Sequence, residues 1–130
     1  MLIVSLVSGI SAKDDIISSA NFPSLYENNI EATYLISVLP RHYLSIRFIE
    51  FDLEYKSNCG YDSLKIVDTS GVELFFGCGE MNGNSIPATE DFPPFIETSV
   101  GVTITFITDH SVTKKGFQLQ AVLGNIVDKH

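Results

Sequence analysis

Residues 51–62 read Phe51-Asp52-Leu53-Glu54-Tyr55-Lys56-Ser57-Asn58-Cys59-Gly60-Tyr61-Asp62, and the rest of the chain is organised around them. The stretch separates two apolar strand patterns and places a Cys and a Gly between two carboxylates, Glu54 and Asp62. Its Ser, Asn and Gly residues are typical of a loop. The sequence therefore predicts a charged loop that contains a cysteine.

Short strand patterns lie on both sides of this loop. Before it, residues 44–51 alternate and place Leu44, Ile46 and Phe48 on one face. After it, the turn sequence 68–71 joins two further patterns into a hairpin. The expected strands are part of 1–12, then 16–18, 34–38, 44–51, 63–67, 72–76, a short one near 85–86, 102–107 and 117–122.

The number and spacing of these strands predict the fold class. No window of helical length carries a sustained apolar stripe, and short strands without helices are typical of an all-β fold, either an antiparallel β-sandwich or a jelly roll. A chain of 130 residues fits one domain. We expect an N-terminal strand or extension over residues 1–15, the main domain over 16–123 and a tail over 124–130.

The apolar N-terminus, residues 1–12, has two interpretations. It could be the core of a signal peptide or a first strand, and the absence of a preceding basic segment favours the strand. No apolar stretch approaches the roughly 18 residues that a membrane span needs. No membrane span is therefore expected.

Charge and motifs exclude several function classes. Eight basic against sixteen acidic residues give a net charge of −8, which repels nucleic-acid phosphates and suits divalent cations or basic protein surfaces. His42, His110 and His130 are isolated, and no hydrolase or metalloprotease motif occurs. We predict no enzymatic activity, although the sequence leaves open a Ser-His-Asp site assembled from distant residues.

The two cysteines, Cys59 and Cys78, are too few for a four-cysteine zinc site and lack the spacing of a redox motif. Their number alone leaves a disulfide and two free thiols as alternatives. A bridge would stabilise the fold by about 3 kcal/mol in the chain-entropy model and would indicate an oxidising compartment.

Three acidic residues are candidate metal ligands. Glu54 and Asp62 stand at facing ends of two predicted strands, joined by a seven-residue loop, and Asp109 begins the polar loop between the last two strands. Three close carboxylates would repel one another, and Ca²⁺, which accepts about six to eight oxygens, would remove that repulsion. On spacing alone, three separately solvated acids remain the simpler interpretation.

Five ordered segments resemble the CUB domain family, a group of extracellular modules. The central one runs from Phe51 to Ile66, and the others are Ser19–Asn29, Phe76–Gly79, Thr108–Ser111 and Lys115–Phe117. Their order and intervals make the resemblance specific, and it covers residues 16–123. It implies a jelly-roll sandwich in which Cys59 and Cys78 form a disulfide.

The resemblance also implies a site. In the calcium-binding subset of the family, the residues that match Glu54, Asp62 and Asp109 are ligands of Ca²⁺. The positions of Ser111 and Val112 contribute oxygen through side chain or backbone. In the same subset, the residue that matches Tyr26 supports the glutamate by a hydrogen bond.

The implied function is that of a secreted, non-catalytic interaction module, whose calcium-loaded site binds a Lys or Arg of an extracellular protein partner. The alternatives are a structural subunit of an extracellular polymer or coat that self-associates, and a carbohydrate-binding role.

Two positions depart from the family pattern. Ala32 stands where the family usually has a cysteine, and Tyr34 stands where it usually has a Trp. Residues 1–15 are then free to pair within the domain or with a neighbouring molecule.

Overall fold

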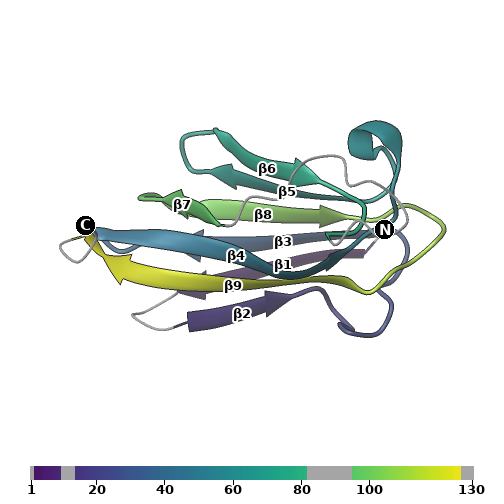
Figure 1. Ribbon diagram of the computed structural model, residues 1–130, viewed down its shortest axis with the longest axis horizontal. Coiled ribbons are helices and arrows are strands. Elements are labelled where there is room, and N and C mark those ends of the chain that lie inside the picture. Colours follow the sequence, from purple (N-terminus) through teal and green to yellow (C-terminus); the bar gives the residue numbers. More distant parts are fainter. Residues whose placement is uncertain (1, 10–13, 82–94, 127–130) are drawn as a thin grey trace.

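The computed structural model describes residues 2–9, 14–81 and 95–126, and these form nine strands and one short 3₁₀ helix (Figure 1). The expected strand near residues 85–86 lies outside the described residues. The elements are β1 (Leu2–Gly9), β2 (Asp14–Ser18), β3 (Ile30–Ser37), β4 (His42–Asp52), η1 (Ser57–Cys59), β5 (Ser63–Asp68), β6 (Glu73–Gly77), β7 (Ile96–Thr98), β8 (Val102–Ile107) and β9 (Gly116–Asn125).

The strands form two sheets, which confirms the predicted β-sandwich. The five-stranded sheet has the order β1-β3-β8-β5-β6 and the four-stranded sheet the order β2-β9-β4-β7. All pairs are antiparallel except β1 with β3, which are parallel. The strands run along the long axis of the molecule, so the loops gather at its two ends (Figure 1). No helix in the described segments is long and apolar enough to cross a bilayer.

Alternating residues of the central strands fill the space between the sheets. Burying each large apolar side chain contributes roughly 1.5–3 kcal/mol. The side chains with no exposed surface include Leu44 and Ile46 of β4, Leu64 and Ile66 of β5, Ile104 of β8, and Phe117 and Leu119 of β9. The apolar alternation in the sequence therefore identifies the core strands correctly.

A bulge in β4 changes which face of the strand points inward. The register between β4 and β9 shifts between Phe48 and Glu50. Strict alternation would direct Glu50 into the core, whereas the extra residue leaves Ile49 38% exposed and buries Phe51. Leu53 is buried beyond the bulge, and its N–H donates to the carbonyl of Gly79 at 2.9 Å. The bulge thus turns Phe51 and Leu53 inward, and the bond to Gly79 holds the segment that leads to Glu54.

Strand bounds differ most from prediction where the local sequence is turn-rich. The three-residue strand β7 was not expected, because it follows a Pro- and Gly-containing segment. Strand β3 begins at Ile30 rather than at residue 34, and β9 continues to Asn125, two residues into the expected tail. Residues 2–9 form β1 at the edge of the five-stranded sheet.

The loop after β4 is held by a disulfide. Cys59 in η1 is bonded to Cys78, which follows β6, and their Cα atoms are 5.5 Å apart. The bond confirms the pairing that the family resemblance implies. Asn58 and Cys59 both have positive φ angles, so the chain turns sharply at the bridge. The disulfide thus attaches the loop between Glu54 and Asp62 to the end of β6, the edge strand of the five-stranded sheet.

Candidate metal centre

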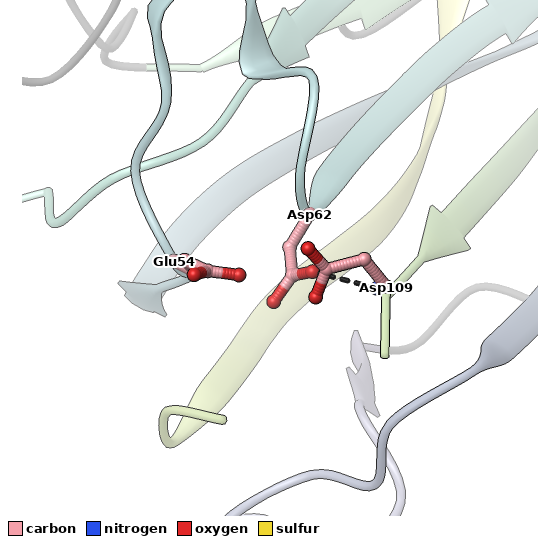
Figure 2. A group of neighbouring side chains, drawn as sticks. All are labelled: Glu54, Asp62 and Asp109. Carbon is pink, nitrogen blue, oxygen red and sulfur yellow. Dashed lines mark hydrogen bonds between the residues drawn. The ribbon is translucent and has the colours of Figure 1, made fainter. Parts of the chain in front are cut away.

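Three carboxylates converge at one end of the sandwich. One oxygen from each of Glu54, Asp62 and Asp109 lies within 4.8 Å of the other two, and Figure 2 shows the three groups facing one another. In the described part of the chain, this is the one group of three or more His, Cys, Asp or Glu side chains with such geometry. The structure therefore brings together the three acids that the sequence singled out.

The three residues come from both layers of the sandwich. Asp62 precedes β5 and Asp109 follows β8, and these strands are neighbours in the five-stranded sheet, with Ser63 opposite Ile107. Glu54 follows β4, which belongs to the four-stranded sheet. Glu54 and Asp62 converge as expected, although β4 and β5, the strands that carry them, lie in different sheets and do not pair. The loop between them crosses from one layer to the other.

Asp62 is the most deeply buried of the three, with no exposed surface. Its Oδ1 accepts a hydrogen bond from the backbone N–H of Asp109 at 2.9 Å, and its Oδ2 accepts one from the Tyr26 hydroxyl at 2.5 Å. Burial raises the pKa of the Asp62 carboxyl, and both hydrogen bonds oppose that rise. The orientation of Asp62 is thus set before any ligand binds.

Tyr26 connects the acids from the loop before β3. Its hydroxyl donates to Asp62 and accepts from the backbone N–H of Glu54 at 3.0 Å. Its ring is almost fully buried and packs edge-to-face on Phe106, with centroids 5.2 Å apart. Burial, followed by the hydrogen bond to Asp62, raises the pKa of the hydroxyl. The support of Glu54 that the resemblance implies therefore reaches its backbone.

The Glu54 side chain is buried but poorly paired. It is only 8% exposed, and its Oε1 is buried without a hydrogen-bond partner among the described residues. Burial, followed by the charges of Asp109 and Asp62, raises the pKa of Glu54 to about 7, and the charge of Lys114 partly opposes this. A buried polar atom without a partner is costly, so Glu54 lacks an interaction that a cation would supply.

Asp109 begins the loop that joins β8 to β9. Its carboxylate is partly exposed, and its Oδ1 accepts from the N–H of Ser111 at 3.2 Å. Val112 has a φ angle of 61°, a left-handed conformation that costs a β-branched residue roughly 1–3 kcal/mol, and its side chain is 51% exposed. Ser111 and Val112 thus shape this loop, and their role as ligands stays a prediction.

Thr108 is a buried support of the site that its position in the sequence does not indicate. Its hydroxyl accepts from the N–H of Ile30 and donates to the carbonyl of Glu27, both at 2.8 Å. The backbone N–H of Asn29 also donates to the carbonyl of Asp109 at 2.7 Å. These bonds attach the Asp109 loop to the Tyr26 loop. No local pattern reveals such contacts between segments far apart in the sequence.

Comparisons with known proteins give the family of the chain. The family model described as CUB domain matches residues 7–120. The chain is 36% identical to mouse Tolloid-like protein 1 over 109 residues, which are 84% of this chain and 10% of that protein. It is 36% identical to rat Cubilin over 122 residues, which are 91% of this chain and 3% of that protein. The chain thus spans a tenth or less of the length of these relatives.

A solved structure shares the fold. The crystal structure of the MASP-1 CUB2 domain bound to Ca²⁺ superposes with a TM-score of 0.64 at 23% identity, covering 88% of this chain and 96% of that chain. At this identity the likeness shows the fold, and the calcium ion is a property of that protein. Together with the family match over residues 7–120, the fold and the disulfide show that the chain belongs to the CUB domain family.

Proposed function

We propose that this chain is a non-catalytic, calcium-binding protein-interaction module of a secreted protein, with Glu54, Asp62 and Asp109 as the carboxylate ligands. The observation that carries the proposal is the buried, unpaired Oε1 of Glu54, a residue whose carboxylate lies beside two further carboxylates. The family supports the coarser part, since CUB domains are generally interaction modules of extracellular proteins.

The donor set fits calcium better than a softer metal. All three groups offer oxygen and none offers sulfur or nitrogen, which is the preference of hard cations. Two oxygens that both contact Ca²⁺ at about 2.4 Å are at most about 4.8 Å apart. The three carboxylate oxygens fall within that limit. A bound cation would also oppose both causes of the raised pKa of Glu54, which are burial and then repulsion from Asp109 and Asp62.

Each ligand would have a distinct part in binding. Asp62 is held by Tyr26 and by the Asp109 N–H, so it is oriented in advance. Glu54 has an unpaired oxygen to give, and Asp109 is the ligand nearest to solvent. We place Ser111 and Val112 at the outer edge of the same site, where a side-chain or backbone oxygen would complete the coordination.

The partner that we propose for the loaded site is a Lys or Arg side chain of an extracellular protein. The partly exposed Asp109 carboxylate would form a charge-assisted hydrogen bond with it. The net charge of −8 favours a basic partner surface and disfavours nucleic acid. The disulfide is consistent with a secreted chain. We retain residues 16–123 as the extent of the domain.

Calorimetric titration with Ca²⁺ tests the metal site. We expect one binding event in the wild type, at least about tenfold weaker binding in Asp109→Asn because an oriented charge is lost, and wild-type affinity in the exposed control Glu73→Gln. Absence of binding in the wild type, or equal affinities for both variants, would refute the site.

A second measurement tests the partner. A short lysine-containing peptide should bind the calcium-loaded wild type more tightly than the same peptide with acetylated lysines. Chelation of calcium and the Asp109→Asn change should each remove that difference. If the difference persists in chelator, calcium does not organise the peptide site and this part of the proposal fails.

A further inference from the structure

We propose that the outer edge of β1 pairs with β1 of a second copy of this chain. The two strands would run antiparallel about a two-fold axis and join two five-stranded sheets into one. This inference uses no residue of the metal centre, so it stands or falls independently of calcium binding.

The proposal starts from the position of β1. It pairs along all eight residues, Leu2–Gly9, with β3 on one side, and no strand among the described residues pairs with its other side (Figure 1). In a parallel ladder alternate residues bond to one neighbour, so the remaining residues direct their N–H and C=O groups away from β3. Such a row of backbone groups is a template for another strand.

The other three edge strands carry features that discourage pairing. Strand β2 has five residues and begins with Asp14-Asp15, and β6 has five residues, begins with Glu73 and pairs with a register shift. Strand β7 has three residues, with Glu97 in the middle. Charges, irregular pairing and short length all protect sheet edges. Strand β1 is longer than these three and contains neither a charged residue nor a proline.

The sequence of β1 fits a copy of itself. A two-fold axis perpendicular to a continuous sheet keeps each residue on the same face in both copies, so odd-numbered residues lie opposite odd ones and even opposite even. The axis must therefore pass midway between the two copies of one residue. If the axis passes between the two copies of Ser5, these serines are opposite each other. Ile3 of each copy then lies opposite Val7 of the other, and Val4 lies opposite Leu6. Pairing of this kind uses the same patch on both copies and therefore closes at a dimer.

Charge limits the strength of this association. Each copy carries a net charge of −8, so two copies repel each other although the edge itself is uncharged. Added salt screens that repulsion and should strengthen the dimer. An edge of eight residues buries little surface, so a weak, concentration-dependent dimer is expected.

Analytical ultracentrifugation from micromolar to near-millimolar concentration, in chelator, tests the interface. We expect the wild type to dimerise. Ser5→Lys and Ser5→Glu, each measured alone, should dimerise with at least about tenfold lower affinity, because like charges then lie opposite each other. An equimolar mixture of the two variants should recover the dimer, because opposite charges then pair. The matched controls are Ser70→Lys and Ser70→Glu in the exposed turn between β5 and β6, which should dimerise like the wild type. Circular dichroism checks that every variant folds.

A cysteine at the proposed axis tests the register. Opposite residues in an antiparallel pair have Cα atoms about 4.5–5.5 Å apart, a distance that a disulfide spans. Ser5→Cys should therefore cross-link under mild oxidation and Ser70→Cys should not. A monomeric wild type at the highest concentration overturns the proposal. A dimer that shows neither recovery in the mixture of Ser5→Lys and Ser5→Glu nor the Ser5→Cys cross-link also overturns it. An exchange of β1 between two copies would give that result.

Discussion

Tyr26 and Asp62, 36 residues apart in the sequence, share a buried hydrogen bond of 2.5 Å in which the tyrosine donates and the carboxylate accepts. The same hydroxyl accepts a hydrogen bond from the N–H of Glu54. One oxygen atom therefore links the backbone of one candidate ligand, Glu54, to the side chain of another, Asp62. The pKa of the tyrosine is raised, which keeps the hydroxyl a donor over the whole physiological range. The acid cluster is therefore organised from a loop that contributes no carboxylate to it.

Tyr26→Phe should destabilise the protein and weaken calcium binding. The change removes one donor from Asp62 and leaves the Glu54 N–H unpaired, and an unpaired buried group costs roughly 1–3 kcal/mol. Urea unfolding and calcium titration measure the two effects. The control is Tyr55→Phe, which removes a hydroxyl from a partly exposed tyrosine on the same loop as Glu54. Equal stability of the two variants would show that the Tyr26 hydroxyl is dispensable.

The metal-free protein should lose stability as the pH rises. Glu54 has a folded-state pKa of about 7, above its ordinary value of 4.5, so between these values the folded state binds more protons than the unfolded state. Stability is then highest near and below pH 4.5 as far as Glu54 is concerned, and it decreases until the pH passes 7. A shift of this size corresponds to roughly 3 kcal/mol. The raised pKa of Asp62 acts in the same direction.

Thermal unfolding in chelator at a series of pH values checks this slope. Calcium should raise the melting temperature most at alkaline pH, because a proton and a cation compete for Glu54 below pH 7. A calcium effect that grows on acidification would contradict the assignment of Glu54 as a ligand.

Glu54→Gln should separate stability from metal binding. The amide has the shape of the protonated acid, so it removes the repulsion from Asp62 and Asp109 and should stabilise the metal-free protein at pH 8. The same change removes a charged ligand, so calcium should no longer raise the melting temperature appreciably. Asp62→Asn is the contrasting variant, because it disturbs hydrogen bonds from Tyr26 and from the Asp109 N–H and should destabilise both forms.

Removal of the disulfide should affect the site as well as the fold. Cys59→Ala combined with Cys78→Ala releases the loop that carries Glu54 at one end and Asp62 at the other. We expect a loss of about 3 kcal/mol in the free energy of unfolding and weaker calcium binding, since the loop must then be ordered by the ion. Titration calorimetry of the double variant measures the second effect. Unchanged calcium affinity would show that the hydrogen bonds of Leu53, Tyr26 and Asp62 hold the loop without the disulfide.

Two glycines with similar φ angles allow a matched test of packing. Gly116 has a φ of 94°, and a Cβ there would lie 2.0 Å from the hydroxyl oxygen of Ser19, whereas Gly71 has a φ of 90° and open space. Gly71→Ala should cost roughly 1–2 kcal/mol for its conformation, and Gly116→Ala should cost clearly more. Urea unfolding compares the two. Equal losses would mean that Ser19 moves aside freely.

Sequence patterns predict this fold well where residues alternate and poorly where distant segments meet. The strand Val102–Ile107 has the predicted bounds, because its alternation is regular and Val102, Ile104 and Phe106 are buried on one face. The bulge at Ile49 and the short β7 depend on pairing with other strands, which no local pattern specifies. In the same way, the three acids could be proposed as a set from the family motif. The bond from Tyr26 to Asp62 and the support by Thr108 required the folded chain.

The position of the acids in two different sheets has a mechanical consequence. Glu54 is attached to the four-stranded layer, whereas Asp62 and Asp109 are attached to the five-stranded layer. A cation held by all three would therefore act as a clasp across the layers at this end of the molecule. If a force pulls the two layers apart, more force should be needed to separate them at this end when the ion is bound than when it is absent. The opposite end, which has no such group among the described residues, should open first.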